Sequence, residues 1–93
     1  MNALKTDQNV LDKVLAAIQN KELSPTAKVL YTVLCNGAKA ADGVLLNVYT
    51  QDEIMELTGI RSKTTIKKGL NELEKRKMIG IMKKHVYNVY VIY

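Results

Sequence analysis

Basic side chains crowd one part of the chain, between residues 61 and 85. This stretch holds nine lysines and arginines against two glutamates, whereas residues 1–60 hold five lysines against seven acidic residues. The nine are Arg61, Lys63, Lys67, Lys68, Lys75, Arg76, Lys77, Lys83 and Lys84. Because ammonium and guanidinium groups pair with phosphate oxygens, such a block indicates a polyanionic partner. The alternative is a lysine-rich face that is only solvated.

Residues suited to catalysis or metal binding are scarce. The chain has one histidine, His85, and one cysteine, Cys35, far apart in the sequence. A zinc site needs three or four such ligands, and nucleophilic catalysis needs a nucleophile beside a base. The chain also lacks a glycine-rich phosphate loop. We therefore expect no enzymatic activity, no metal and no cofactor.

Length and composition favour one small folded domain. The chain has 93 residues, of which 47% are hydrophobic and 25% charged, with a net charge of +5. No apolar run approaches the ~20 residues that span a membrane. The first ten residues are too polar for the apolar core of a signal peptide. We expect a cytoplasmic protein with no membrane partner.

Residues 6–20 have the periodicity of an amphipathic helix, with Thr6 as its cap. Large apolar residues recur there at spacings of three and four: Val10, Leu11, Val14, Leu15 and Ile18. This face can fold back onto the rest of the chain or pair with a second copy. We expect the pairing, which makes residues 1–22 a dimerisation element in a homodimer.

The second predicted helix begins at Ser24 and Pro25, because serine caps a helix and proline suits its first position. It extends to about Asn36. Residues 38–43 are expected to form a loop of small residues. Residues 44–49 are rich in valine and leucine and predict a strand.

Two further helices joined by a short turn are predicted next. Thr50 and Glu53 have the spacing of a capping box, and the helix that they begin ends at Gly59. A longer helix follows over residues 62–77. This pair has the arrangement of a helix-turn-helix motif.

Two apolar stretches, residues 78–83 and 86–92, predict a final hairpin joined at Lys84 and His85. The strand at 44–49 can pair with it to give a three-stranded antiparallel sheet. The sequence therefore predicts an α+β fold. It is a winged helix-turn-helix domain over residues 23–93 with an additional amino-terminal helix.

Short motifs between residues 23 and 81 strengthen this interpretation: Leu23-Ser24, Ala27-Lys28, Leu30-Tyr31, Tyr49-Thr50, Leu70, Leu73-Glu74 and Ile79. In these motifs the chain resembles bacterial winged helix-turn-helix DNA-binding proteins. It is most similar to the amino-terminal domain of plasmid replication initiators from Gram-positive bacteria. The resemblance implies the fold and DNA binding. Segregation adaptors and transcription regulators share the pattern, so it leaves the biological role open.

The helix at 62–77 is the candidate recognition helix, because the major groove admits an α-helix whose amino-terminal residues reach base edges. The candidate contacts in and before it are Arg61, Ser62, Lys63, Thr64, Thr65, Lys67, Lys68 and Asn71. Thr50 and Gln51, at the start of the preceding helix, are candidate phosphate contacts. The basic hairpin tip, Lys83, Lys84 and His85, is expected to lie along the DNA backbone.

The predicted function is sequence-specific binding of double-stranded DNA. The protein would act as a transcriptional regulator or as a plasmid or phage maintenance factor that binds a replication or partition site. The alternative is a winged-helix adaptor that binds protein and does not touch DNA. A second protein partner beside DNA is compatible with the first interpretation.

Overall fold

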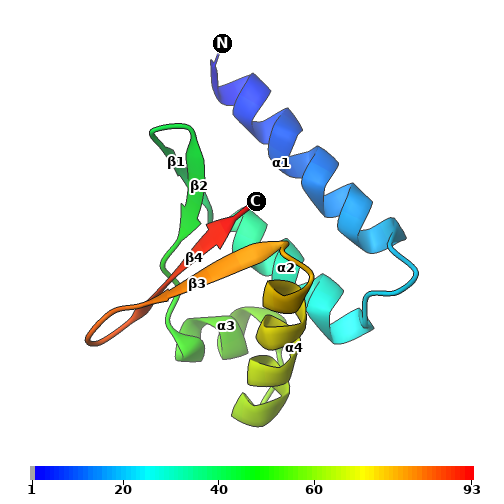
Figure 1. The fold of residues 1–93 in the computed structure, drawn as a ribbon, viewed down its shortest axis with the longest axis vertical. Coiled ribbons are helices and arrows are strands. Elements are labelled where there is room, and N and C mark those ends of the chain that lie inside the picture. The colour runs from blue at the N-terminus through cyan, green and yellow to red at the C-terminus, as the bar shows by residue number, and fades with distance from the viewer. Residues whose placement is uncertain (1) are drawn as a thin grey trace.

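The computed structural model describes the backbone of residues 2–93 and the side chains of residues 9–93 (Figure 1). Its elements are α1 (Asn2–Gln19), α2 (Pro25–Asn36), β1 (Lys39–Ala41), β2 (Val44–Asn47), α3 (Gln51–Thr58), α4 (Lys63–Lys75), β3 (Ile79–Lys83) and β4 (Asn88–Ile92). This is the α+β architecture of a winged helix-turn-helix domain with a preceding helix, as the sequence predicts.

Helices α2, α3 and α4 begin where their capping residues predict. The Ser24 hydroxyl accepts the Ala27 N–H at 3.1 Å, and the Thr50 hydroxyl accepts the Glu53 N–H at 3.1 Å. Glu53 returns the contact by accepting the Thr50 N–H at 2.8 Å, which completes the capping box. These local bonds confirm the predicted helix starts.

The sheet has four strands in the order β1-β2-β4-β3, so the prediction of three strands was wrong. The segment expected to be a loop turns back at Asp42 and Gly43, with φ angles of 52° and 79°, and pairs Ala41 with Val44. Positive φ at both central residues is the requirement of the tightest hairpin turns. The extra strand escaped prediction because all its residues are exposed and none is β-branched.

Helix α1 starts at Asn2, four residues before its predicted start, so Thr6 lies inside the helix and does not begin it. It packs against α2 through Ala17, which is buried, and through Val10 and Val14. Three further apolar residues, Leu11, Leu15 and Ile18, stay about half exposed. Over the described residues, no helix is long and apolar enough to cross a membrane.

Helix α2 is the centre of the core. Leu30 and Leu34 are fully buried, together with Ile54 of α3, Ile66 and Leu73 of α4 and Tyr90 of the sheet. Gly69 lets α4 approach α2 closely, because a β-carbon at this position would overlap the Leu30 side chain. One side of α4 is thereby fixed on α2, and the opposite side is free.

The end of α4 leads directly into the hairpin β3–β4. Lys77 has a φ of 60°, and the N–H groups of Lys77 and Met78 bond the carbonyls of Glu74 and Leu73 at 3.0 Å each. This pattern is a Schellman motif, which closes a helix with a left-handed residue. Strand β3 begins two residues later, so the hairpin's position depends on how α4 ends.

Candidate nucleic-acid interface

Helices α3 and α4 are joined by the turn 59–62. Gly59 adopts the left-handed conformation with a φ of 75°, and Ile60 packs against the core. The Ser62 hydroxyl accepts the Thr65 N–H at 3.2 Å and so caps α4. In Figure 1 the two helices lie at the end of the molecule away from the hairpin β1–β2.

The exposed side of α4 carries several of the residues predicted to contact DNA. Thr64, Lys67 and Asn71 recur at spacings of three and four, and all three are exposed, as is Lys68 beside them. The buried residues of α4 point the other way, toward α2 and α3: Ile66, Gly69, Leu70 and Leu73. Thr65 lies on the α2 side, in a shallow depression that it shares with Ser24 and Thr26.

A groove lies between α4, the start of α3 and the hairpin β3–β4. Its volume is about 370 Å³, and a neighbouring depression of about 270 Å³ shares Gln51, Lys67 and Lys83 with it. The predicted residues that line the two are Thr50, Gln51, Lys67, Asn71, Lys83, Lys84 and His85. The two depressions together are called the groove below, and three successive elements, α3, α4 and the hairpin, place polar and cationic side chains around it.

The other predicted residues lie outside this groove. Arg61, Ser62, Lys63, Thr64 and Thr65 lie at the amino-terminal end of α4, and Lys68 lines the depression on its α2 side. The Lys63 ammonium lies 3.9 Å from the Asp52 carboxylate, and both side chains are well exposed. Such an exposed pair contributes about 0–1 kcal/mol, so it leaves Lys63 available to a phosphate.

Several lining residues were not predicted: Tyr49, Val86, Tyr87, Asn88 and Tyr90 in the groove, and Leu70 and Ile81 in the neighbouring depression. Tyr90 is almost fully buried, yet its hydroxyl accepts a 3.4 Å bond from the Asn88 amide. Asn88 and Tyr90 belong to β4, in the stretch 86–92 that the sequence predicts as a strand. The one available signal was an amide side chain within an otherwise apolar strand.

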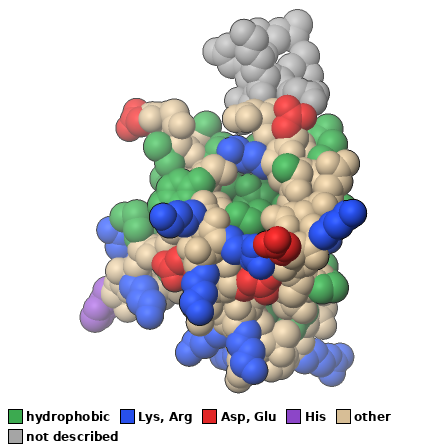
Figure 2. Space-filling view, turned by 45° about the vertical axis from the view of Figure 1, so that its right-hand side comes forward, with side chains coloured by type: hydrophobic (Ala, Val, Ile, Leu, Met, Phe, Trp, Pro, Cys, Tyr) green, Lys and Arg blue, Asp and Glu red, His purple; other side chains and the backbone are tan. Residues whose placement is uncertain are grey.

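The hairpin tip is a tight turn in which the Lys84 N–H bonds the Tyr87 carbonyl at 2.8 Å. Lys83, Lys84 and His85 are all exposed there. Figure 2 shows most of the lysine and arginine side chains of one face in its lower half, below a patch of hydrophobic side chains.

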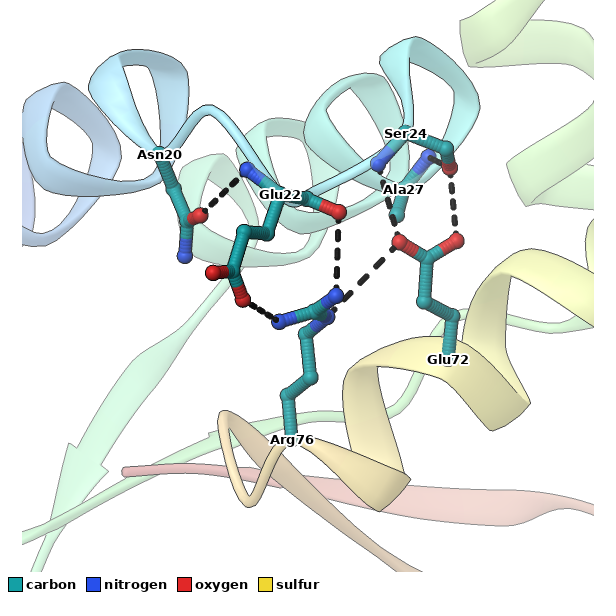
Figure 3. A network of polar contacts seen from close by, with 6 residues as sticks. All are labelled: Asn20, Glu22, Ser24, Ala27, Glu72 and Arg76. Carbon is teal, nitrogen blue, oxygen red and sulfur yellow. Dashed lines mark hydrogen bonds and ion pairs between the residues drawn. The ribbon is translucent and has the colours of Figure 1, made fainter.

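Arg76 belongs to the basic block but takes part in a different cluster (Figure 3). Its guanidinium donates to the Glu22 carbonyl at 3.0 Å and to the Glu22 carboxylate at 3.3 Å. Its Nε lies 3.9 Å from Glu72 Oε2. Glu72 accepts two bonds from Ser24, and these bonds, with the Arg76 charge, hold the pKa of Glu72 below its ordinary value.

The cysteine considered for catalysis is buried in the core. Burial raises the pKa of the Cys35 thiol to about 11, so the thiol stays protonated and is a poor nucleophile. Among the residues with described side chains, no three histidine, cysteine or acidic groups gather where they could hold a metal ion.

Comparison with protein families adds one finding. A family model described as a helix-turn-helix domain matches residues 21–79. This span contains α2, α3 and α4 and ends at the first residue of β3. No curated protein and no solved structure shows a significant match to the chain.

Proposed function

The chain belongs to the helix-turn-helix domain family, and from that membership we propose that it binds double-stranded DNA in a sequence-specific manner. The observation that carries the proposal is the groove between α3, α4 and the hairpin. Lysines from two elements, Lys67 and Lys83, line it beside the amides of Gln51 and Asn71. Cations and amides around a groove next to an exposed helix suit a nucleic-acid backbone and its base edges.

Within this proposal, α4 enters the major groove and reads bases through Thr64, Lys67 and Asn71. Asparagine pairs with adenine through two hydrogen bonds, and lysine pairs with guanine O6 and N7. Lys63 and Lys68 flank this row and contact phosphates. Ser62 serves mainly as the helix cap, because its hydroxyl is engaged by the Thr65 N–H.

The remaining contacts are made to phosphates. The start of α3 presents Gln51 and the positive end of the helix dipole. Thr50 serves mainly as the helix cap, because its N–H and its hydroxyl are both engaged with Glu53. Arg61 in the turn and the hairpin tip, Lys83, Lys84 and His85, extend this surface on both sides. These contacts release counterions and therefore supply most of the affinity.

We also propose that residues 1–22 form a dimerisation element attached to a DNA-binding domain at 23–93. Leu11, Leu15 and Ile18 form a second apolar stripe on α1, at 45–49% exposure, beside the stripe that packs on α2. Pairing this stripe with its copy removes it from water. The two α4 helices would then read half-sites about one DNA turn, ~34 Å, apart.

For the biological role, we propose a cytoplasmic transcriptional regulator or a plasmid or phage maintenance factor acting at a replication or partition site. The resemblance to the amino-terminal domain of plasmid replication initiators supports the second role. The exposed stripe on α1 favours one other candidate, an adaptor that binds protein alone. In that case the basic groove would have no ligand.

Titration of the protein with duplex DNA at several salt concentrations tests DNA binding. If about six phosphates are neutralised, the slope of log K against log salt is about −5. No retention of duplex DNA at low salt, or a flat salt response, would leave only the adaptor.

A further inference from the structure

Arg76 lies at the last turn of α4, between two lysines, where charge alone suggests a contact with DNA. In the structure, the Arg76 side chain instead contacts Glu22. Figure 3 shows its guanidinium reaching from the end of α4 to the link between α1 and α2. There it holds Glu22 by the backbone carbonyl, at 3.0 Å, and by the carboxylate, at 3.3 Å. Three donors of the planar guanidinium are thus directed at Glu22 and Glu72.

Glu72, one helical turn before Arg76, binds Ser24 at the other end of the link between α1 and α2. Its two carboxylate oxygens accept the Ser24 N–H at 2.8 Å and the Ser24 hydroxyl at 2.6 Å. Ser24 is also the cap of α2, through the Ala27 N–H. Arg76 therefore clamps the end of α4 on Glu22, 54 positions away before α2, and Glu72 clamps it on Ser24, 48 positions away at the start of α2.

This clamp lies where the recognition helix passes into the hairpin. Lys77 makes the left-handed turn directly after Arg76, and β3 begins at Ile79. The groove is lined by Lys67 and Asn71 of α4 on one side and by Lys83 of β3 on the other. A shift of the last turn of α4 would move these two sides relative to each other.

We propose that Arg76 is a positioning residue, which holds α4 and the hairpin in the arrangement that fits DNA and does not itself contact DNA. Glu22 and Glu72 are its partners in this role. The inference rests on the proposed DNA-binding function. It separates Arg76 from those cations of the block that the proposed function places in direct contact with bases or phosphates.

Salt dependence distinguishes the two roles of Arg76. The probes are a duplex selected from a random-sequence library by the wild-type protein and a random-sequence duplex of equal length. Arg76→Gln is expected to weaken binding to the selected duplex about tenfold, the effect of losing one base contact, with an unchanged salt slope. A phosphate contact would instead lower the slope by about 0.9 and weaken both duplexes equally, which would overturn the inference.

A conservative replacement gives a second readout. Arg76→Lys keeps the charge but lacks the planar fork that spans Glu22 and Glu72, so it is expected to bind as weakly as Arg76→Gln. Rescue of wild-type affinity by lysine contradicts a positioning role. Lys75→Gln, which removes the same charge one residue earlier, is the matched control and is expected to reduce the salt slope.

A third variant, Glu22→Ala, tests the inference even if the Arg76 variants unfold, because a positioning role and simple electrostatics predict opposite changes in its DNA affinity. Glu22 is mostly exposed, and Glu22→Ala removes a negative charge, which by electrostatics alone strengthens DNA binding. A positioning role predicts weaker binding to the selected duplex, by about threefold. Unchanged or tighter binding overturns the inference. If the wild-type protein itself fails to bind either duplex at low salt, the proposed function fails, which is a separate outcome.

Discussion

Glu72 of α4 accepts both the backbone N–H and the hydroxyl of Ser24, at 2.8 and 2.6 Å, although 48 residues separate them. The same serine hydroxyl caps α2. One carboxylate therefore joins the start of α2 to α4. The stability of the fold and its dependence on pH therefore depend in part on this contact.

The first prediction concerns pH. The pKa of Glu72 is lowered by its bonds to Ser24 and by Arg76, so its ionised form stabilises the folded protein. This contribution is complete above the unfolded pKa of about 4.3 and is lost as the pH falls through the lower folded value. Glu72→Gln is expected to cost about 1 kcal/mol at pH 7, measured by urea unfolding. The difference between variant and wild type shrinks on acidification; a difference that grows there contradicts this assignment.

The second prediction concerns the end of α4. Lys77 has a φ of 60°, a conformation that costs a side-chain-bearing residue about 1 kcal/mol relative to glycine. Lys77→Gly should therefore raise the free energy of unfolding by about 0.5–1 kcal/mol in urea titrations. Gly59→Ala, at a φ of 75°, makes the reverse change and should destabilise by a similar amount. If both variants changed the free energy of unfolding in the same direction, the left-handed conformation assigned to one of these residues would be wrong.

The third prediction concerns the contact of α4 with α2. Alanine is a better helix former than glycine by about 1 kcal/mol, so helix propensity alone favours Gly69→Ala. The new methyl group would overlap Leu30, which is fully buried and cannot move aside freely. Overpacking costs about 1–3 kcal/mol, so we expect a net loss of stability and a lower melting temperature. A rise in melting temperature would show that the helices are less closely packed.

The fourth prediction concerns self-association. Leu15 lies in the exposed stripe of α1, so Leu15→Glu should shift sedimentation from dimer to monomer without unfolding the chain. Ala16→Glu adds the same charge at the neighbouring exposed position and is the control. A monomeric wild type, or equal effects of both changes, removes the proposed role of α1.

Local chemistry made much of the fold predictable. The caps at Ser24 and Thr50 depend on residues within three positions, and the structure confirms both. The turn at Asp42 and Gly43 was also a local signal, but its strand has no apolar alternation and was read as a loop.

The candidate site was less predictable because it is assembled from distant segments. The periodicity of α4 placed Lys67 and Asn71 on its exposed side, but Asn88 and Tyr90 enter the groove through the pairing of β4 with β3. The charge count grouped Arg76 with its neighbouring lysines. Its true partner, Glu22, is 54 residues away, and no spacing in the sequence indicates such a contact.

The central claim is that duplex DNA is bound at the groove between α4 and the hairpin. Its most direct test compares two double variants. The groove variant carries Lys67→Ala and Lys83→Ala together, and the control variant carries Lys21→Ala and Lys39→Ala, at exposed residues outside the groove. Both variants lose two charges. We expect the groove variant to keep its melting temperature, to lose duplex affinity at least tenfold and to lower the salt slope by about 2, while the control stays near wild type. Equal losses in the two variants would contradict the claim, because binding would then follow net charge and not the groove.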